Sequence, residues 1–220
     1  MPDERQYAPA TERNRDVILA VLQSVLPPKG TVLEVSSGTG QHAVYFAPRL
    51  QPRTWLPSDP SAEALRSIVA WQRHQPAENL RPPIYLDARD SVWPVEKDAA
   101  SSGPDSDSAA RTNPVGPITA IVNINMLHIS PWEAGLGLLA GAGRILAEAG
   151  GVLYLYGPFQ IQGQMMPSNA AFDQMLRSQN PAWGVRELDD VVAAAQAQGL
   201  KLVKQVPMPA NNLSLVFKVG

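Results

Sequence analysis

The chain has 220 residues, 45% of them hydrophobic, which is enough for one globular domain with a sizeable buried core. Its formal net charge is −2, so no overall positive charge indicates nucleic acid or an anionic membrane as a partner. The absence of Cys excludes disulfides, thiolate metal ligands and cysteine nucleophiles. The polar first 16 residues lack the apolar core of a secretory signal, and no apolar run reaches the roughly 20 residues of a membrane span. We therefore expect one cytoplasmic domain over residues 1–220, with no metal site.

The first half of the chain alternates short apolar runs with helical patterns. Apolar residues at helical spacing before Pro27-Pro28 predict a first helix. Asp59 is predicted to cap a later helix, with Pro60 at its first helical position. We predict strands at 32–35, 54–58, 82–88 and 118–127, and helices at about 17–26, at about 40–49 and from 59 onward.

The second half continues the alternation but ends differently. Ser130-Pro131-Trp132-Glu133 has the pattern of a capping box and predicts a helix to about Ala149. A fifth strand is predicted at 150–157, and helices from about Ser168 and Glu187. Two strands, 200–208 and 211–219, then follow each other with only a short turn between them, so we expect them to pair antiparallel.

Strands that alternate with helices predict an α/β fold, with a largely parallel sheet covered by helices on both faces. The closing strand pair makes the sheet mixed at one edge. The segment 96–117, rich in Ser, Asp and Pro, is predicted to be a mobile loop between the third and fourth strands.

A turn of small residues, Ser36-Ser37-Gly38-Thr39-Gly40, follows the first predicted strand. Ligands of open α/β sheets bind at the carboxyl ends of the strands, where this turn lies. Residues 38–43 match the dinucleotide fingerprint G-x-G-x-x-A. The match alone fits a dinucleotide, S-adenosylmethionine (SAM), or a tight connection that binds nothing.

Three carboxylates bear on these alternatives. Asp59 ends the second strand, where an acidic side chain can accept hydrogen bonds from a ribose diol of either ligand. Glu34, inside the first strand, would repel a pyrophosphate and suits the positive charges of SAM. Asp87 ends the third strand, where it could accept from the adenine amine beside the Ala88 N–H, or could simply be a turn residue.

Polar residues near the end of the fourth strand are candidates for the reacting part of the site. Asn123 and Asn125 alternate onto one face and could hold the methionine end of SAM or a substrate, or could tie down loops. His128 is a candidate general base, with a structural histidine as the alternative. His42, in the first turn after the glycines, is expected to shape the cofactor pocket.

Several longer blocks resemble the methyltransferase-like 26 family: "LEVSSGTGQHAVYFA", "PSDPSAEALRSIVAW", "NINMLHISPWEA" and "MPANNLSLVFKV". The resemblance extends from about Arg13 to Val219. It implies a Rossmann-like class I SAM-dependent methyltransferase with a seven-stranded sheet in the order 3-2-1-4-5-7-6, strand 7 antiparallel. Ser36 stands where these enzymes commonly have Gly, and Gly38 and Gly40 complete the cofactor turn.

The substrate side of the site is predicted from the same blocks and from the end of the fifth strand. Residues 6–14 are interpreted, by analogy with this fold, as a lid over the pocket. The candidate substrate-binding residues are Asn14, Asn125, Tyr156, Phe159, Asn169, Trp183 and Asn211.

Together these observations predict SAM-dependent methyl transfer to a small-molecule acceptor. No N-P-P-Y-like run follows the fourth strand and no basic stretch is interleaved with aromatic residues, so a nucleic-acid substrate is not indicated. Two other functions stay open at this point: an NAD(P)-binding oxidoreductase and a non-catalytic SAM-binding module.

Overall fold

A computed structural model describes residues 3–96, 116–147 and 150–220. The predicted mobile loop 96–117 lies almost entirely outside these residues. The strands are β1 (Thr31–Val35), β2 (Thr54–Asp59), β3 (Ile84–Tyr85), β4 (Ile118–Ile124), β5 (Val152–Gln160), β6 (Arg186–Glu187), β7 (Leu200–Met208) and β8 (Asn212–Val219). The α-helices are α1 (Pro9–Val25), α2 (Gln41–Phe46), α3 (Ala62–His74), α5 (Trp132–Ala147), α6 (Pro167–Gln179) and α7 (Leu188–Gln196).

The strands form one sheet in the order β3-β2-β1-β4-β5-β8-β7. Strands β1 to β5 are parallel, whereas β8 runs antiparallel to both β5 and β7. This confirms the predicted Rossmann-like α/β fold and its mixed edge. The structure adds one strand that was not predicted, β6, which pairs with β5 over only two residues.

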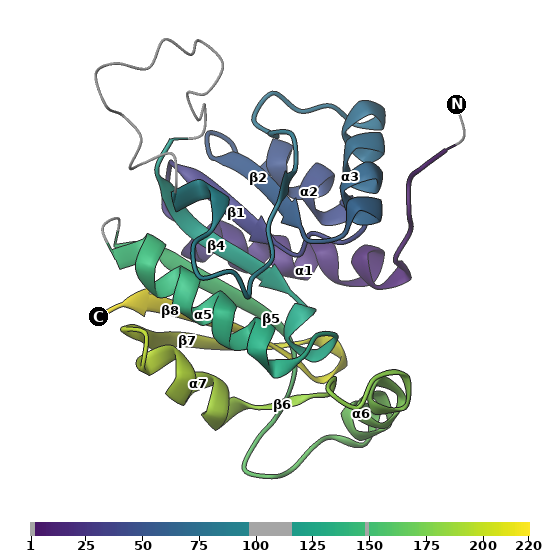
Figure 1. The fold of residues 1–220 in the computed structure, drawn as a ribbon, viewed down its shortest axis with the longest axis vertical. Helices are drawn as coiled ribbons and strands as arrows, with labels where there is room; N and C mark the ends of the chain where they lie inside the picture. Colours follow the sequence, from purple (N-terminus) through teal and green to yellow (C-terminus); the bar gives the residue numbers. More distant parts are fainter. Residues whose placement is uncertain (1–2, 97–115, 148–149) are drawn as a thin grey trace.

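Helices cover the two faces of the sheet (Figure 1). Helices α5 and α7 bury one face, in a cluster that includes Leu33, Leu138 and Val191. Helices α1 and α2 bury the other, where Ile18 and Phe46 pack. Because alternate residues of a strand point to opposite faces, Val32 and Leu33 of β1 belong to different clusters. Strand β1 is therefore covered on both sides, as its apolar sequence requires.

The first helix begins earlier than predicted. Pro9 stands at its first turn, and the apolar stripe begins only with Ile18, so the periodic pattern marked the second half of the helix. Residues 9–14 are consequently helical. The preceding segment lies against α3, where Ser67 Oγ accepts from Gln6 N and Trp71 Nε1 donates to Gln6 O. Residues 6–14 do not line the cavity described below, and the lid over the pocket stays a prediction.

Both predicted helix caps are corrected by the structure. Ser61, not Asp59, caps α3, and its Oγ accepts from Ala64 N at 3.3 Å. Helix α5 begins at Trp132, and the Ser130 hydroxyl donates to the Met126 carbonyl at 2.7 Å instead of closing the predicted box. In each case the candidate cap instead makes a hydrogen bond that orders the turn at the carboxyl end of a strand.

Three strand ends also differ from the prediction. Strand β3 stops two residues before Asp87, and β4 stops at Ile124. Asn125 has φ 65°, so it does not continue the alternation of Asn123 and opens a short 3-10 turn, Met126–His128. Strand β5 is longer than predicted and includes Tyr156 and Phe159.

Gly40 fixes how closely α3 approaches the glycine turn. Its φ is 86°, and a Cβ there would lie 2.8 Å from the Ile68 Cα. Gly38, with φ 57°, has nothing within 4 Å of the same point, so open space lies beside it.

We expect Gly40→Ala to lower the free energy of unfolding by about 2–5 kcal/mol, because it combines a left-handed L-residue with overpacking against backbone. Gly38→Ala is the matched control and should lose only the strain, about 1–2 kcal/mol. Denaturant unfolding measures both. Equal losses would show that the contact with Ile68 does not limit this turn.

Candidate functional site

A cavity of about 450 Å³ opens at the carboxyl ends of β1, β2 and β4. Six residues predicted from the sequence line it together: Ser36, Gly38, Asp59, Asp87, Ala88 and Trp183. The rest of the lining was not singled out from the sequence and is mainly apolar. It comes from the end of β4 and the turn after it, from the start of α5 and from the loop after α6, with two residues from the opposite side. These residues are Ile124, Met126, Ile129, Ser130, Pro131, Ala134 and Asn180, and, opposite them, Pro60 and Arg89. The cavity therefore joins the glycine turn to the turn after β4.

The glycine turn presents backbone to this cavity. Ser36 has φ 59°, the left-handed conformation that explains why Gly is usual at this position. Three of the turn's amides already have partners: Ser37 N donates to Ser58 O at 2.8 Å, Gly38 N to Asp59 Oδ2 at 2.9 Å and Gly40 N to Ser37 O at 3.1 Å. A dinucleotide turn needs such amides for the pyrophosphate, so this geometry does not favour one.

Asp59 connects the turn to the end of β2. Its Oδ2 accepts from Gly38 N, and its Oδ1 accepts from Ser61 N at 2.9 Å. The carboxyl group is buried, and burial raises its pKa, although the two backbone bonds lower it. A carboxylate can accept about four hydrogen bonds, so Asp59 keeps capacity for a ligand that enters the cavity.

Glu34 lies under the turn and does not line the cavity. Its side chain is 2% exposed, and its Oε2 accepts from Trp55 Nε1 and from Ser37 Oγ, each at 3.0 Å. Burial raises its pKa to about 7, and the charge of Asp59 adds to this, whereas the bonds from Trp55 and Ser37 lower it. The prediction that β1 is central is confirmed, but a charge acting directly on a ligand is not what the structure shows.

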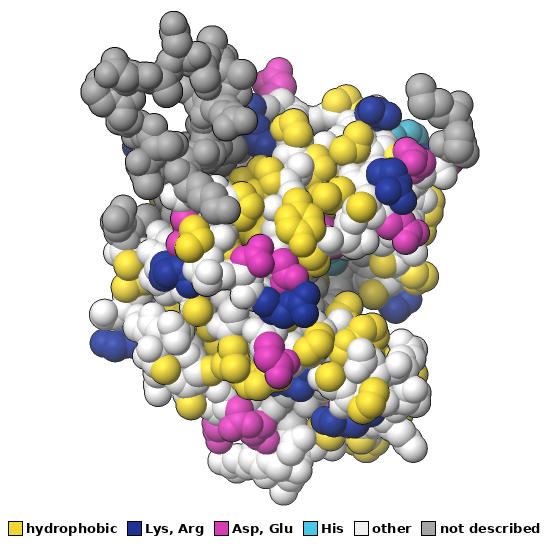
Figure 2. Space-filling model, viewed as in Figure 1, with side chains coloured by type: hydrophobic (Ala, Val, Ile, Leu, Met, Phe, Trp, Pro, Cys, Tyr) yellow, Lys and Arg dark blue, Asp and Glu magenta, His cyan; other side chains and the backbone are white. Residues whose placement is uncertain are grey.

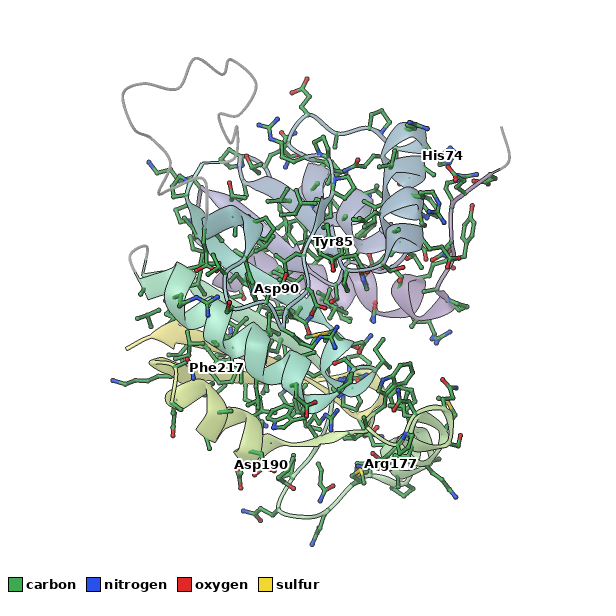
Figure 3. All side chains as sticks on the ribbon, viewed as in Figure 1. His74, Tyr85, Asp90, Arg177, Asp190 and Phe217 are labelled. Atoms are coloured by element: carbon green, nitrogen blue, oxygen red, sulfur yellow. The ribbon has the colours of Figure 1, made fainter. Side chains whose placement is uncertain are left out.

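Asp87 faces the cavity with an internal partner. Arg89 binds it through Nε, through its terminal nitrogen and through its backbone N–H, and this guanidinium lowers the pKa of Asp87. Figure 2 shows acidic and basic side chains side by side near the middle of this face, below hydrophobic ones. Figure 3 shows that Tyr85 and Asp90, on either side of this pair in the sequence, lie in the same region. Arg89 could have been noticed as a basic residue two positions after Asp87.

Two predicted residues at the end of β4 lie beneath the cavity wall. Asn123 is 1% exposed and donates to Val35 O at 2.9 Å, while its Oδ1 has no partner among the described residues. His128 is fully buried, packs edge-on against Phe159 and has no described partner for either ring nitrogen. Burial and the nearby Arg186 lower its pKa to about 3, so it is neutral near pH 7. His128 does not line the cavity. Its role as a general base stays a prediction.

The other predicted residues form separate groups. His42 Nε2 lies 2.9 Å from Asn14 Oδ1 and its ring stacks on Phe46. Burial raises the pKa of the Tyr156 phenol, while Asn14 lowers it. Further along the chain, Asn169 Nδ2 donates to Asn211 O, which ties α6 to the β7–β8 turn. None of these side chains lines the cavity, and Gly40 acts through packing against α3.

A second cavity, of about 370 Å³, lies beside β6 and contains no predicted residue. Three of its four charged side chains are engaged within the protein: Arg177 pairs with Asp173, Arg186 donates to Leu127 O and Ser130 O, and Glu187 accepts from Gln162 N and Gly163 N. Figure 3 shows Arg177 on α6 and Asp190 on α7, in the lower part of the view.

Neither a membrane span nor a metal-binding cluster occurs among the described residues. No helix among them has the length and apolar character to cross a membrane. They also contain no group of three or more His, Asp or Glu side chains placed to hold a metal ion.

The fold is the Rossmann-like α/β fold of known methyltransferases. Similar solved structures include mitomycin 7-O-methyltransferase MmcR (TM-score 0.72, 10% identity, covering 96% of this chain and 54% of that chain). Human N-acetylserotonin methyltransferase in complex with SAM has a TM-score of 0.70 at 12% identity, over 96% of this chain and 53% of that one. An O-methyltransferase family protein from Burkholderia thailandensis has a TM-score of 0.70 at 13% identity, over 95% and 56%. The present chain thus spans little more than half the length of these structures.

The chain belongs to the DUF938 family, described as a protein of unknown function, whose match covers residues 5–219.

Ser36→Gly tests whether the turn is strained. A left-handed L-residue costs about 1–2 kcal/mol, while Gly costs about 0.5–1 kcal/mol in backbone entropy, so we expect stabilisation of about 0–1.5 kcal/mol. Ser36→Ala, which keeps the strain, should change stability by less than about 0.5 kcal/mol. Denaturant midpoints measure both, and a destabilised glycine variant would contradict the strain.

His128 should make the protein sensitive to acid. Its pKa is about 3 in the folded protein, against 6.5 for an ordinary His, so the unfolded chain binds one more proton between these values. The free energy of unfolding should therefore fall by up to about 1.4 kcal/mol per pH unit as the pH drops from about 6.5 toward 3.

His128→Gln should reduce this slope between pH 6.5 and 4 by the contribution of one proton, about 1.4 kcal/mol per pH unit. Denaturant unfolding at each pH measures it. The exposed His74 provides the control His74→Gln, which should keep the wild-type slope. Identical slopes for wild type and His128→Gln would show that His128 takes up its proton without unfolding.

Proposed function

We propose that this protein is a SAM-dependent methyltransferase acting on a small-molecule acceptor. The supporting observation is the cavity in which the glycine turn, Asp59 and the pair Asp87–Ala88 meet. SAM would supply a methyl group bound to a sulfonium. When the methyl group is transferred, the sulfur leaves as a neutral thioether. The resemblance to the methyltransferase-like 26 family belongs to the same proposal.

The described residues fit such a ligand. Asp59 has lone pairs left for a ribose diol, and Asp87 and the Ala88 backbone lie where an adenine edge could be recognised. The missing side chain of Gly38 leaves open space beside the turn, so the ligand can approach its backbone. The mainly apolar wall from β4 and α5 suits the flat face of a base.

Within this proposal the protein contributes mainly alignment. Holding two reactants in line gains roughly 7–11 kcal/mol in favourable systems, without a general base. No charged side chain of the described residues lines the cavity other than Asp59, Asp87 and Arg89. An uncharged small acceptor fits this lining better than a polyanion, which would meet two carboxylates.

Ligand-induced stabilisation tests the proposal. SAM or S-adenosylhomocysteine at about 100 times its dissociation constant should raise the free energy of unfolding by about 2.7 kcal/mol. Asp59→Asn should lose most of this increment, because one acceptor oxygen is removed. Asp90→Asn, which changes an exposed acid outside the cavity lining, should keep it.

Other outcomes separate the remaining functions. Stabilisation by NADH with none by SAM would overturn the proposal in favour of an oxidoreductase. SAM binding without transfer of labelled methyl groups to any component of a metabolite extract would indicate a non-catalytic SAM-binding module.

A further inference from the structure

The cavity beside β6 gathers four charged side chains from three elements. Arg177 comes from α6, Arg186 and Glu187 form β6, and Asp190 lies in the first turn of α7. Two positive and two negative groups leave the lining without a net charge. Among the described residues, no ion pair joins one of these four groups to another. The opposite charges of the lining therefore do not neutralise one another by contact.

Arg186 is held in place while part of its guanidinium stays unused. Its Nε donates to Leu127 O at 2.9 Å, and its Nη2 donates to Ser130 O at 2.7 Å and to Ala182 O at 2.9 Å. Its Cζ lies over the Trp132 ring, 5.6 Å from the ring centroid. Its Nη1 donates no hydrogen bond to the described residues. A guanidinium that is fixed before a ligand arrives loses less side-chain entropy when the ligand binds.

Arg177 adds a second guanidinium to the same cavity. Its Nε donates to Asp173 Oδ2 at 2.8 Å, and neither of its terminal nitrogens donates a hydrogen bond to the described residues. Burial lowers the pKa of Arg186, and the positive charge of Arg177 lowers it further. Asp173 and Glu133 act in the opposite direction. Two like charges that share a cavity favour an anion beside them, and the planar fork of each guanidinium matches a carboxylate.

The two acids of the lining differ in their partners. Glu187 accepts from Gln162 N at 2.9 Å and from Gly163 N at 3.0 Å, so backbone groups partly compensate its charge. Asp190 is exposed and accepts no hydrogen bond from the described residues. Figures 1 and 3 show β6 between α7, which carries Asp190, and α6, which carries Arg177. A polyanion would meet both acids, whereas a ligand that also carries an ammonium group can pair with Asp190.

We propose that this cavity binds a free α-amino acid with an apolar side chain. The carboxylate binds the unused nitrogens of Arg177 and Arg186, and the ammonium pairs with Asp190. The apolar side chain lies against Trp132 and Val185, which complete this part of the lining. A zwitterion has no net charge, as the lining has none, and the volume of about 370 Å³ lies in the range of small-molecule sites, roughly 300–1,000 Å³.

This site is separate from the one proposed for SAM. The two cavities share no lining residue, so binding of an amino acid goes beyond the proposed function and does not depend on it. One Trp lines each cavity: Trp132 the cavity beside β6, and Trp183 the cavity at the glycine turn. The indole N–H signals of the five Trp residues can therefore locate a ligand in the whole chain by NMR.

Titration with L-leucine tests the site, with Trp132→Phe and Trp183→Phe used to assign the two signals. We expect L-leucine to move the Trp132 signal in a saturable way and by more than it moves the Trp183 signal. A larger effect on Trp183, or no saturable effect on either signal, would overturn the inference. A separate titration with SAM tests the proposed function through the Trp183 signal, so the two can fail independently.

Two derivatives of the probe separate its charges. N-acetyl-L-leucine lacks the ammonium and L-leucinamide lacks the carboxylate, so each should bind about tenfold or more weakly than L-leucine, because a hydrogen bond to a charged group is lost. Asp190→Asn should weaken L-leucine by a similar factor and leave N-acetyl-L-leucine unchanged. Arg177→Gln should weaken L-leucine and leave L-leucinamide unchanged.

Asp189→Asn is the matched control, since Asp189 is an exposed acid in the same turn of α7 and does not line the cavity. It should bind L-leucine as the wild type does. Equal L-leucine affinity in the wild type and in Asp190→Asn would contradict pairing of the ammonium with Asp190 and sink the inference. Tighter binding of N-acetyl-L-leucine than of L-leucine would identify a site for anions instead, with the same consequence.

Discussion

The site depends on one turn, residues 36–40, whose left-handed backbone suits Gly38 and Gly40 but not Ser36. Ser36, Gly38 and Gly40 all have positive φ. Hydrogen bonds from three directions offset this: Asp59 binds Gly38 N, Ser67 Oγ donates to Thr39 O at 2.7 Å, and Ser37 Oγ reaches Glu34. Because β1 and β2 are parallel neighbours, their carboxyl ends bring both acids to the same turn.

Asp59 and Glu34 both support the turn and are both buried. Asp59 and Glu34 order the backbone of the turn, and both are buried enough for the pKa of each to be raised. An ionised carboxylate repels a phosphate, but a protonated carboxyl group does not. The stronger objection to a dinucleotide is therefore the use of the Gly38 amide by Asp59, which the glycine spacing alone does not reveal.

The sequence pattern predicted the α/β sheet and the edge where the site forms, because periodicity fixes the elements and parallel strands share one carboxyl end. The order of the strands was implied only by the family resemblance. Asp59 and Asp87, which the sequence selected as cofactor-binding candidates, both line the cavity, and their binding role stays a prediction. The sequence did not predict that the indole of Trp55 reaches Glu34 from the next strand, since the partner of a buried side chain depends on register. Likewise, the alternation of side chains could not show that β4 ends before Asn125, because the positive φ of Asn125 is a property of the turn.

The segment ahead of α1 illustrates a further limit of local reasoning. Gln6 N donates to Ser67 Oγ, whose own hydrogen goes to Thr39 O, and Ala8 N donates to Gln41 Oε1 at the other end of the turn. Hydrogen bonds in series polarise and strengthen one another. Residues 28 to 61 positions apart thus form one cooperative unit, in which the segment before the first helix and the backbone that faces the cavity become ordered, or loosen, together.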